Sequence, residues 1–267
     1  GNNSTYYGVV KVPESMLYRI SKTAHDLGWQ LGFHAIGDAA IIETVNVFER
    51  VLRENPRSDH RHYITHFGVL PPDSILEKIA DLGIVVSQQP NFTYFNVAYQ
   101  VAGLEGRRLA TNNPSKSLLR HGIRMSYGSD DLPHGPLLGI WSAVTRRGID
   151  GKVYAAEEGV TVEEAIKAYT MGSAYQNFDE ERVGSVEPGK AADFVVLSDD
   201  ILNLVDWASF APHVRYRESV RRGYVILDVT PERAVASWYH FERIDIDEGS
   251  SSFLWSVCVR KGPSHPD

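Results

Sequence analysis

Short β-rich segments alternate with helical patterns through the first 150 residues, and this alternation narrows the possible folds more than any other feature. Segments rich in β-branched and aromatic residues, bounded by turn residues, predict strands at 29–35, 62–66, 84–90 and 123–130. Strands separated by helices are typical of a parallel sheet built from β/α units. The sequence therefore predicts an α/β fold.

The helical patterns have clear start and stop signals. The first ends at Pro56, the second closes on Gly83, and the last begins with Thr161 and Glu164 at the spacing of a capping box. We expect helices over 38–56, 74–83, 137–147 and 161–178.

Three of the four predicted strands end in a side chain that can bind a metal or catalyse: His34, His66 and Asp130. In parallel α/β folds the carboxyl ends of the strands share one face, so distant residues can meet there. His34 and His66 are 32 residues apart. This spacing matches one unit of an eight-fold β/α barrel, which uses about 250 residues, or roughly 31 per unit.

Each candidate has a structural alternative. A lone strand-end histidine such as His34 is more often a core residue, and the matching positions of His66 and Asp130 favour ligation instead. Asp38 either orients a ligand or caps the helix that follows it, and capping is favoured. His134 either lies at the mouth of a pocket or belongs to a loop.

Aromatic residues crowd an irregular segment after the third strand. Phe92 and Tyr94 either contact an apolar substrate or pack within a lid. His62 alternates in phase with His66, yet structural packing is favoured for it. Three further histidines lie near turns or on amphipathic helices and are expected to be solvated: His25, His60 and His121.

Composition indicates an ordinary globular chain with a small-molecule partner. The 267 residues are 43% hydrophobic, and 27 Lys and Arg face 34 Asp and Glu, for a net charge of −7. This balance gives no basic field for nucleic acid. No apolar run reaches the roughly 20 residues that span a bilayer, and the amino end lacks the pattern of a signal peptide.

The single cysteine, Cys258, can form no disulfide within the chain and is read as a small buried hydrophobe. Its isolation leans toward a cytoplasmic location. The sequence does not begin with Met, which favours a fragment.

The carboxyl-terminal region has a different character. After a turn and a strand within 184–200, two segments around Pro231-Glu232 alternate like antiparallel strands, and 253–260 adds a third. We expect three parts: barrel units over 1–182, a β-sandwich return segment over 183–200, and a β-rich tail over 201–267.

Four motifs in order, "HAIGD", "HYITHFGVLPPD", "YGSDDLPHGPLLGIWSAVTR" and "EPGKAADFVVL", resemble the amidohydrolase superfamily and, within it, the YtcJ-like branch called amidohydrolase family 3. The resemblance implies that these motifs belong to barrel strands five, six and eight, and to the return into a small β-sandwich. The chain would then hold the second half of a TIM-type barrel.

The resemblance also implies the roles of the site residues. His34 and His66 match the family's two single metal-ligand histidines, and Asp130 matches the aspartate that binds metal and shuttles a proton. Zn²⁺ or another divalent metal, as one or two ions, would acidify a bound water for attack on an amide carbonyl. Asp130 would pass the water's proton to the leaving nitrogen.

The sequence departs from the family pattern at several points. The His-x-His pair of strand one and the carboxylated Lys of strand four are absent. Thr65 stands where the family usually has Glu, and Asp131 where Trp is common. From about 205 onward the tail resembles the final strands of PhoD-like alkaline phosphatases, without that family's metal ligands.

These observations favour a metal-dependent hydrolase of carbon–nitrogen bonds, incomplete in this chain. An inactive barrel fragment or binding scaffold is the alternative, and a phosphoesterase is a weaker one. Four strands cannot close a barrel, so exposed strand edges need cover. We expect a homo-oligomer, the missing barrel half, or the tail's strands to supply it.

Overall fold

The computed structural model describes residues 11–97, 101–130, 135–193, 195, 201, 223–229, 233–241 and 251–260. The chain divides into two compact units, Gly1–Val205 and Asp206–Asp267. The finer division at residues 182 and 200 stays a prediction. Asp131, His134 and most of the strand expected after Asp193 lie outside the described residues.

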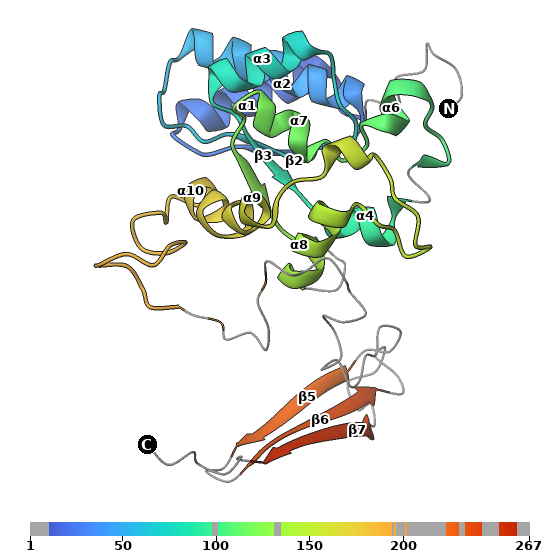
Figure 1. Cartoon of the computed structure of the whole chain (residues 1–267). Coiled ribbons are helices and arrows are strands. Elements are labelled where there is room, and N and C mark those ends of the chain that lie inside the picture. The colour runs from blue at the N-terminus through green and yellow to red at the C-terminus, as the bar shows by residue number, and fades with distance from the viewer. Residues whose placement is uncertain are drawn as a thin grey trace. The chain divides into compact units, whose positions relative to one another are not determined.

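A four-stranded parallel sheet forms the centre of the first unit (Figure 1). The strands pair in chain order and are β1 (Gly32–Ala35), β2 (Tyr63–His66), β3 (Val85–Gln88) and β4 (Met125–Tyr127). All four predicted strands and their parallel pairing are confirmed. The ladders are shorter than the predicted segments: β1 and β2 begin later than predicted, and β3 and β4 are shortened at both ends.

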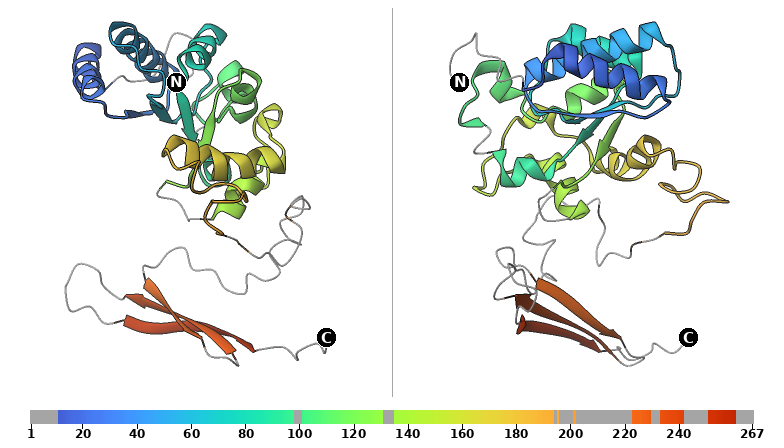
Figure 2. Two further views of the ribbon diagram at one scale, coloured as in Figure 1. Left: turned by 90° about the vertical axis from the view of Figure 1, so that its left-hand side faces the viewer. Right: turned by 180° about the vertical axis from the view of Figure 1, so that it is seen from behind.

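Helices gather on one side of this sheet and curve around it (Figure 2). They are α1 (Glu14–Asp26), α2 (Asp38–Glu54), α3 (Asp73–Leu82) and α7 (Ser115–Arg120). Phe33 of β1 packs toward α1 and α2, against a cluster that contains Leu17, Val47 and Val51. Burial of these apolar side chains away from water is what holds the helices on the sheet.

Alternation along the strands turns the neighbouring residues the other way. His34, Thr65, Ser87 and Ser126 pair in register across the four strands and form a polar row on the inner face. A curved sheet with helices outside and this row inside has the form of half a β/α barrel.

Two helix ends follow from local chemistry. Helix α2 stops at Glu54 because Asn55 precedes Pro56 and takes an extended φ of −141°. Helix α3 ends on Gly83, whose φ of 69° lies in the left-handed region that glycine adopts without strain. The predicted end on Gly83 is confirmed, and α2 is two residues shorter than predicted.

The other described helices of the first unit lie after β3 and β4. They are α4 (Asn91–Phe95), α6 (Gly106–Ala110), α8 (Pro136–Thr145), η1 (Ala156–Glu158), α9 (Val162–Lys167), the π-turn η2 (Ala168–Gly172) and α10 (Ser173–Gln176). The segment expected to be irregular after β3 thus contains the short helix α4. The capping box of Thr161 and Glu164 is confirmed.

The sequence predicts a single helix over 161–178. The π-turn η2 interrupts this helix, and the residues around the turn pack against the outer edge of β4. Arg124 and Gly128 bond to β3, so the carbonyls of Met125 and Tyr127 point away from the sheet. A Cβ at Gly172 would collide with the Met125 carbonyl, and Ser173 Oγ donates to the Tyr127 carbonyl at 3.2 Å. This edge of the sheet is therefore covered from within the same unit.

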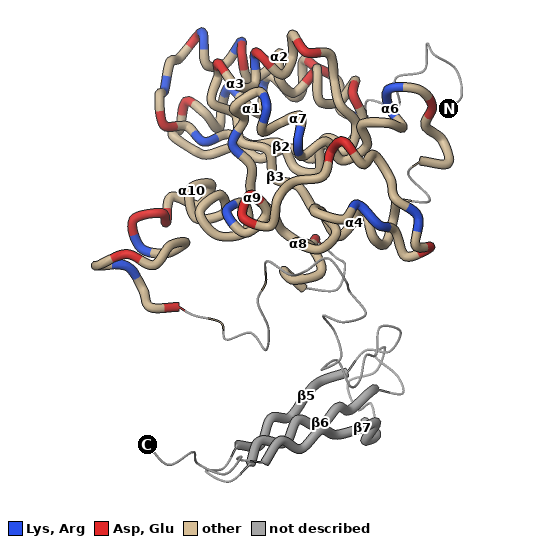
Figure 3. The backbone as a smooth tube through the Cα atoms, viewed as in Figure 1, with Lys and Arg blue, Asp and Glu red and all other residues tan. Residues whose placement is uncertain are grey.

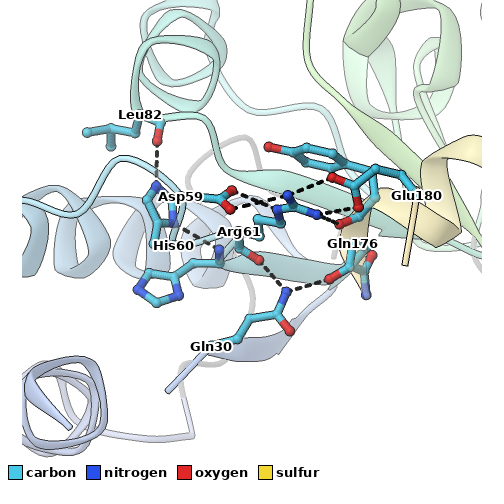
Figure 4. A network of polar contacts seen from close by, with 9 residues as sticks. Gln30, Asp59, His60, Arg61, Leu82, Gln176 and Glu180 are labelled. Atoms are coloured by element: carbon cyan, nitrogen blue, oxygen red, sulfur yellow. Dashed lines mark hydrogen bonds and ion pairs between the residues drawn. The ribbon is translucent and has the colours of Figure 1, made fainter. Parts of the chain in front are cut away.

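Arg61 ties the end of this helical segment to the amino ends of the strands (Figure 4). Its guanidinium binds Asp59 and Glu180 and donates to the carbonyl of Tyr175. The side chain lies over the Tyr175 ring, 4.1 Å from its centroid. Gln30 donates to the carbonyls of both Arg61 and Gln176 (Figure 4). Residues 175–180 therefore close the amino-terminal end of the half barrel.

Three histidines form a buried network beside this closure. A backbone N–H of Leu31 donates to His62 Nδ1, so His62 Nε2 carries its hydrogen and donates to His25 Nδ1 at 2.9 Å. His25 Nε2 then donates to the Asn55 carbonyl, and His60 Nε2 donates to the Leu82 carbonyl. His62 is buried, as predicted. The expectation that His25 and His60 are solvated is wrong, because their bonds join three helix ends to the sheet.

The second unit is a three-stranded antiparallel sheet. Its strands are β5 (Gly223–Val229), β6 (Arg233–Phe241) and β7 (Ser251–Arg260), in the order β5-β6-β7. The predicted antiparallel strands are confirmed, and a β-bulge falls between Trp238 and Tyr239. In the described part of the chain no helix is long and apolar enough to cross a membrane.

The histidine network makes the free energy of unfolding depend on pH. Burial lowers the pKa of His62 to about 3, whereas an unfolded histidine titrates near 6.5. The unfolded chain therefore binds the extra proton first, and stability present above pH 6.5 is lost as the pH falls toward 3. We expect a loss of about 2 kcal/mol between pH 7 and pH 5 from this group, measured by urea unfolding.

The control is His62→Gln, which keeps a donor and an acceptor but does not titrate. It should be less stable at pH 7 and should lose much less on acidification. An unchanged pH dependence in this variant would show that the network does not hold a neutral imidazole.

Candidate functional site

The three strand-end residues gather at the carboxyl rim of the sheet. The rings of His34 and His66 meet edge to face, with centroids 4.4 Å apart. His66 Nε2 lies 3.8 Å from Asp130 Oδ2. The structure thus brings together side chains from β1, β2 and the end of β4, with His66 in the middle.

Strained backbone shapes this rim. His66 has a φ of 78°, and Phe67, which follows it, has a φ of 58°. Asp130 has a φ of 54°. Left-handed conformations at residues with a Cβ cost about 1–2 kcal/mol each, and such strain concentrates at functional sites. The turns end the strands and direct both side chains over the rim.

Gln89, the residue directly after β3, contacts His66. Its Oε1 lies 2.8 Å from His66 Nδ1, and its Nε2 donates to the Ser87 carbonyl at 3.3 Å. The Ser87 carbonyl can only accept, so the amide nitrogen must face it and the amide oxygen must face His66. His66 Nδ1 therefore carries the hydrogen, and Nε2 presents its lone pair to Asp130.

This arrangement fits a cation in part. His66 Nε2 and Asp130 Oδ2 lie 3.8 Å apart, and imidazole nitrogen and carboxylate oxygen are ligands that zinc accepts. Among the described residues, however, no three His, Cys, Asp or Glu side chains enclose a single metal position. His34, His66 and Asp130 supply suitable donors without closing the site.

Burial and neighbouring charge favour the neutral form of His66. The side chain is 8% exposed. Burial lowers its pKa, and His34 lowers it further, against opposing effects of Gln89 and Asp130. A neutral imidazole is the form that binds metal.

The predicted substrate residues have different surroundings. Phe92 stacks on His66, with ring centroids 5.6 Å apart and planes 24° apart, so it lies at the site. Tyr94 packs instead against Phe95 and Trp141, at 4.9 and 5.7 Å. The structure therefore places Phe92 at the rim, and it places Tyr94 against α8.

Asp38 does not cap α2, so that expectation is wrong. Gly37 is the N-cap residue, and Asp38 lies in the first turn. Asp38 Oδ2 accepts from Nε and Nη2 of Arg108 at 2.9 and 2.7 Å. The cost of burying the carboxylate is offset by this paired guanidinium rather than by the helix end.

Helix α6 is tied to the rim by two consecutive arginines. Arg108 pairs with Asp38 at the start of α2, and Arg107 pairs with Asp73 at the start of α3 at 2.9 Å. The first pair is largely buried, and the second is exposed. In the part of the first unit that Figure 3 colours, positive and negative residues are otherwise interspersed.

Sequence reasoning missed three residues at this site: Gln89, Asn91 and Arg108. Asn91 Nδ2 donates at 3.0 Å to the carbonyl of Ser129, the residue before Asp130. The sequence did offer an indication for Gln89 and Asn91. These two amide side chains flank Pro90, directly after a strand that carries no metal ligand at its end. Arg108 left no such signal, because its partner lies 70 residues away.

A curved parallel sheet with helices outside and histidines at its carboxyl rim defines the fold class as half of a β/α barrel. The sequence profile of the amidohydrolase family matches residues 4–226, and the chain belongs to this family. The predicted family is confirmed. The match runs past residue 205, and the resemblance of the tail to alkaline phosphatases stays a prediction.

Two curated relatives share the same region. The chain is 35% identical over 198 residues to the putative amidohydrolase YtcJ of Bacillus subtilis, covering 72% of this chain and 37% of YtcJ. It is 27% identical over 199 residues to the N-substituted formamide deformylase of Arthrobacter pascens, covering 73% of this chain and 36% of the relative. The chain thus spans less than two fifths of these relatives.

Solved structures agree on the fold. An uncharacterized metal-dependent hydrolase from Pyrococcus horikoshii OT3 matches with a TM-score of 0.63 and 26% identity, covering 76% of this chain and 40% of that one. One from Pyrococcus furiosus matches with a TM-score of 0.60 and 26% identity, covering 75% and 40%. The partial coverage is consistent with a partial barrel.

The two arginine pairs of α6 should contribute unequally to stability. Asp38→Asn and Arg108→Gln should show a coupling of about 1–2 kcal/mol in a double-mutant cycle, because a largely buried, charge-assisted pair is screened little. The matched pair, Asp73→Asn and Arg107→Gln, should couple by less than about 0.5 kcal/mol because it is exposed. Equal couplings in urea unfolding would contradict the assignment of Arg108 as the anchor.

Proposed function

We propose that this chain supplies the carboxyl-terminal half of the active site of a metal-dependent hydrolase that cleaves amide-type carbon–nitrogen bonds. The observation that carries the proposal is the His66 Nε2 lone pair facing Asp130 Oδ2 at 3.8 Å, with His34 beside it. Family membership and the relative that deformylates N-substituted formamides support the bond type.

His34, His66 and Asp130 would hold the divalent ion, zinc in the first instance. Zinc accepts imidazole nitrogen and carboxylate oxygen together, and neutral His66 needs no deprotonation before binding. Bound there, such an ion would lower the pKa of its water and polarise an amide carbonyl. Whether the site holds one ion or two stays open in this proposal.

Asp130 is the proton carrier of the proposal. Its side chain lies at the rim beside His66 and is 44% exposed, so it can exchange protons with a bound substrate. It takes a proton from the attacking water and delivers it to the leaving nitrogen as the carbon–nitrogen bond breaks. The carboxylate ends each cycle in its starting form.

Substrate binding would involve the aromatic side of the rim. Phe92 offers an apolar face beside His66. Tyr94 and His134 were predicted alongside it, and their contact with a small amide-type substrate stays part of this proposal. A cytoplasmic location, indicated by the lone cysteine, is part of it too.

The first test combines metal content with hydrolysis. We expect about one zinc per chain, lost in His66→Ala and kept in the control His121→Ala, whose ring bonds only the Ser117 carbonyl of its own helix among the described contacts. An N-formyl amine should be hydrolysed by the form that contains a complete barrel. Metal-free, folded wild-type protein would favour the inactive scaffold, and cleavage of a phosphodiester alone would favour the phosphoesterase.

The open side of the sheet is where we propose that the barrel is completed. The backbone groups of Gly32 and His34 point away from β2, because Leu31 and Ala35 make the bonds to it. Helix α1, which precedes β1, exposes Met16 and Ile20, and the exposed Leu27 and Trp29 follow it. A groove of about 520 Å³ runs between Arg19, Ile20, Leu27 and Trp29. A strand beside β1 and a helix against α1 would cover both.

The isolated chain should therefore associate with a second copy through this surface. We expect sedimentation above the monomer mass for the wild type and monomers for Ile20→Glu combined with Leu27→Glu, since charges in an apolar interface cost several kcal/mol. Arg120→Glu, on the exposed side of α7, should leave association unchanged. A cooperative wild-type monomer would contradict this part of the proposal.

A further inference from the structure

We infer that Gln89 is a positioning residue for this site: by accepting the hydrogen of His66 Nδ1, it selects the ring orientation that turns Nε2 toward Asp130. The inference concerns the metal-free protein, and only its consequence for metal affinity rests on the proposed function.

Phe92 and His34 do not select this orientation by themselves. Stacking on Phe92 at an angle of 24° fixes the plane of the His66 ring. A rotation of 180° about the Cβ–Cγ bond keeps that plane while it exchanges ring nitrogens for ring carbons. Edge-to-face contact with His34 at 4.4 Å tolerates both orientations. A polar contact is needed to distinguish them.

Gln89 provides that contact from a fixed position. The side chain is 8% exposed and held by its own bond to the Ser87 carbonyl. Its amide therefore keeps its oxygen toward His66, and 2.8 Å between Oε1 and Nδ1 is a full hydrogen bond. Losing it would leave a buried N–H without a partner, which is costly.

The consequence falls on the other ring nitrogen. With Nδ1 protonated, Nε2 has a free lone pair 3.8 Å from Asp130 Oδ2. Residues that hold the distal N–H of a ligating histidine fix its tautomer and orientation, and their loss typically lowers metal affinity about 10–100-fold. Gln89 and Asn91 flank Pro90 and reach the neighbouring strand ends on opposite sides.

The test is the tautomer of His66 in metal-free, full-length protein, read from long-range ¹⁵N–¹H NMR of labelled histidine above pH 8. Wild type should have hydrogen on Nδ1. Gln89→Glu keeps an acceptor at the same place and should keep this tautomer. Gln89→Met has similar size without an acceptor and should shift the ring toward the Nε2–H form. The control Gln88→Met removes an amide that bonds Phe67 and Ser115, and it should leave the tautomer unchanged.

Zinc titration provides the second readout. Gln89→Met should bind zinc about 10–100-fold more weakly than wild type, and Gln89→Glu at least as tightly. An Nε2–H tautomer in the wild type, or Nδ1–H unchanged in Gln89→Met, would overturn the inference. Should Gln89→Met fail to fold, the wild-type tautomer still decides. If the tautomer follows prediction but no variant binds zinc, the proposed function fails and the positioning role stands.

Discussion

Parallel pairing of β1 to β4 in chain order is the constraint on which the site depends. It places every strand's carboxyl end at one rim, so His66 contacts His34 and lies 3.8 Å from Asp130, which comes much later in the chain. The same pairing aligns His34, Thr65, Ser87 and Ser126 as one polar row on the inner face. The apolar cluster of α1 and α2 covers the outer face, which leaves the inner face and the rim for chemistry.

The two edges of the sheet are treated differently. At β4, the π-turn and α10 cover the outward-facing carbonyls, and Ser173 donates to one of them. Arg61, which lies just before β2, binds the carbonyl of Tyr175 in α10 at the amino-terminal end of the sheet. At β1, the backbone groups of Gly32 and His34 point away from β2, and helix α1, which precedes this strand, exposes apolar side chains. Among the described residues the half barrel is therefore covered at β4 and has no strand paired to the outer edge of β1, which matches a chain that covers less than two fifths of its curated relatives.

Much of this arrangement was predictable because its causes are local. The alternation of β-rich and helical segments gave the four strands, and the capping box and Gly83 marked helix ends through their own backbone chemistry. The convergence of His34, His66 and Asp130 followed from the rule for parallel sheets. Each of these depends on spacing along the chain.

Other features depend on partners that spacing does not reveal. His25 sits at the end of an amphipathic helix, and only its bonds to His62 and Asn55 show why it is buried. Asp38 has the sequence of a helix cap, but Arg108, 70 residues later, takes its carboxylate. Gln89 follows a strand with no ligand, and its role appears only when β2 lies beside β3.

The most direct test of the central claim is a zinc-soaked crystal measured at the zinc absorption edge. We expect an anomalous peak at the rim with His66 Nε2 and Asp130 bound at about 2.0–2.2 Å and with Gln89 still hydrogen-bonded to His66 Nδ1. A peak elsewhere, or zinc bound through His66 Nδ1, would contradict the central claim.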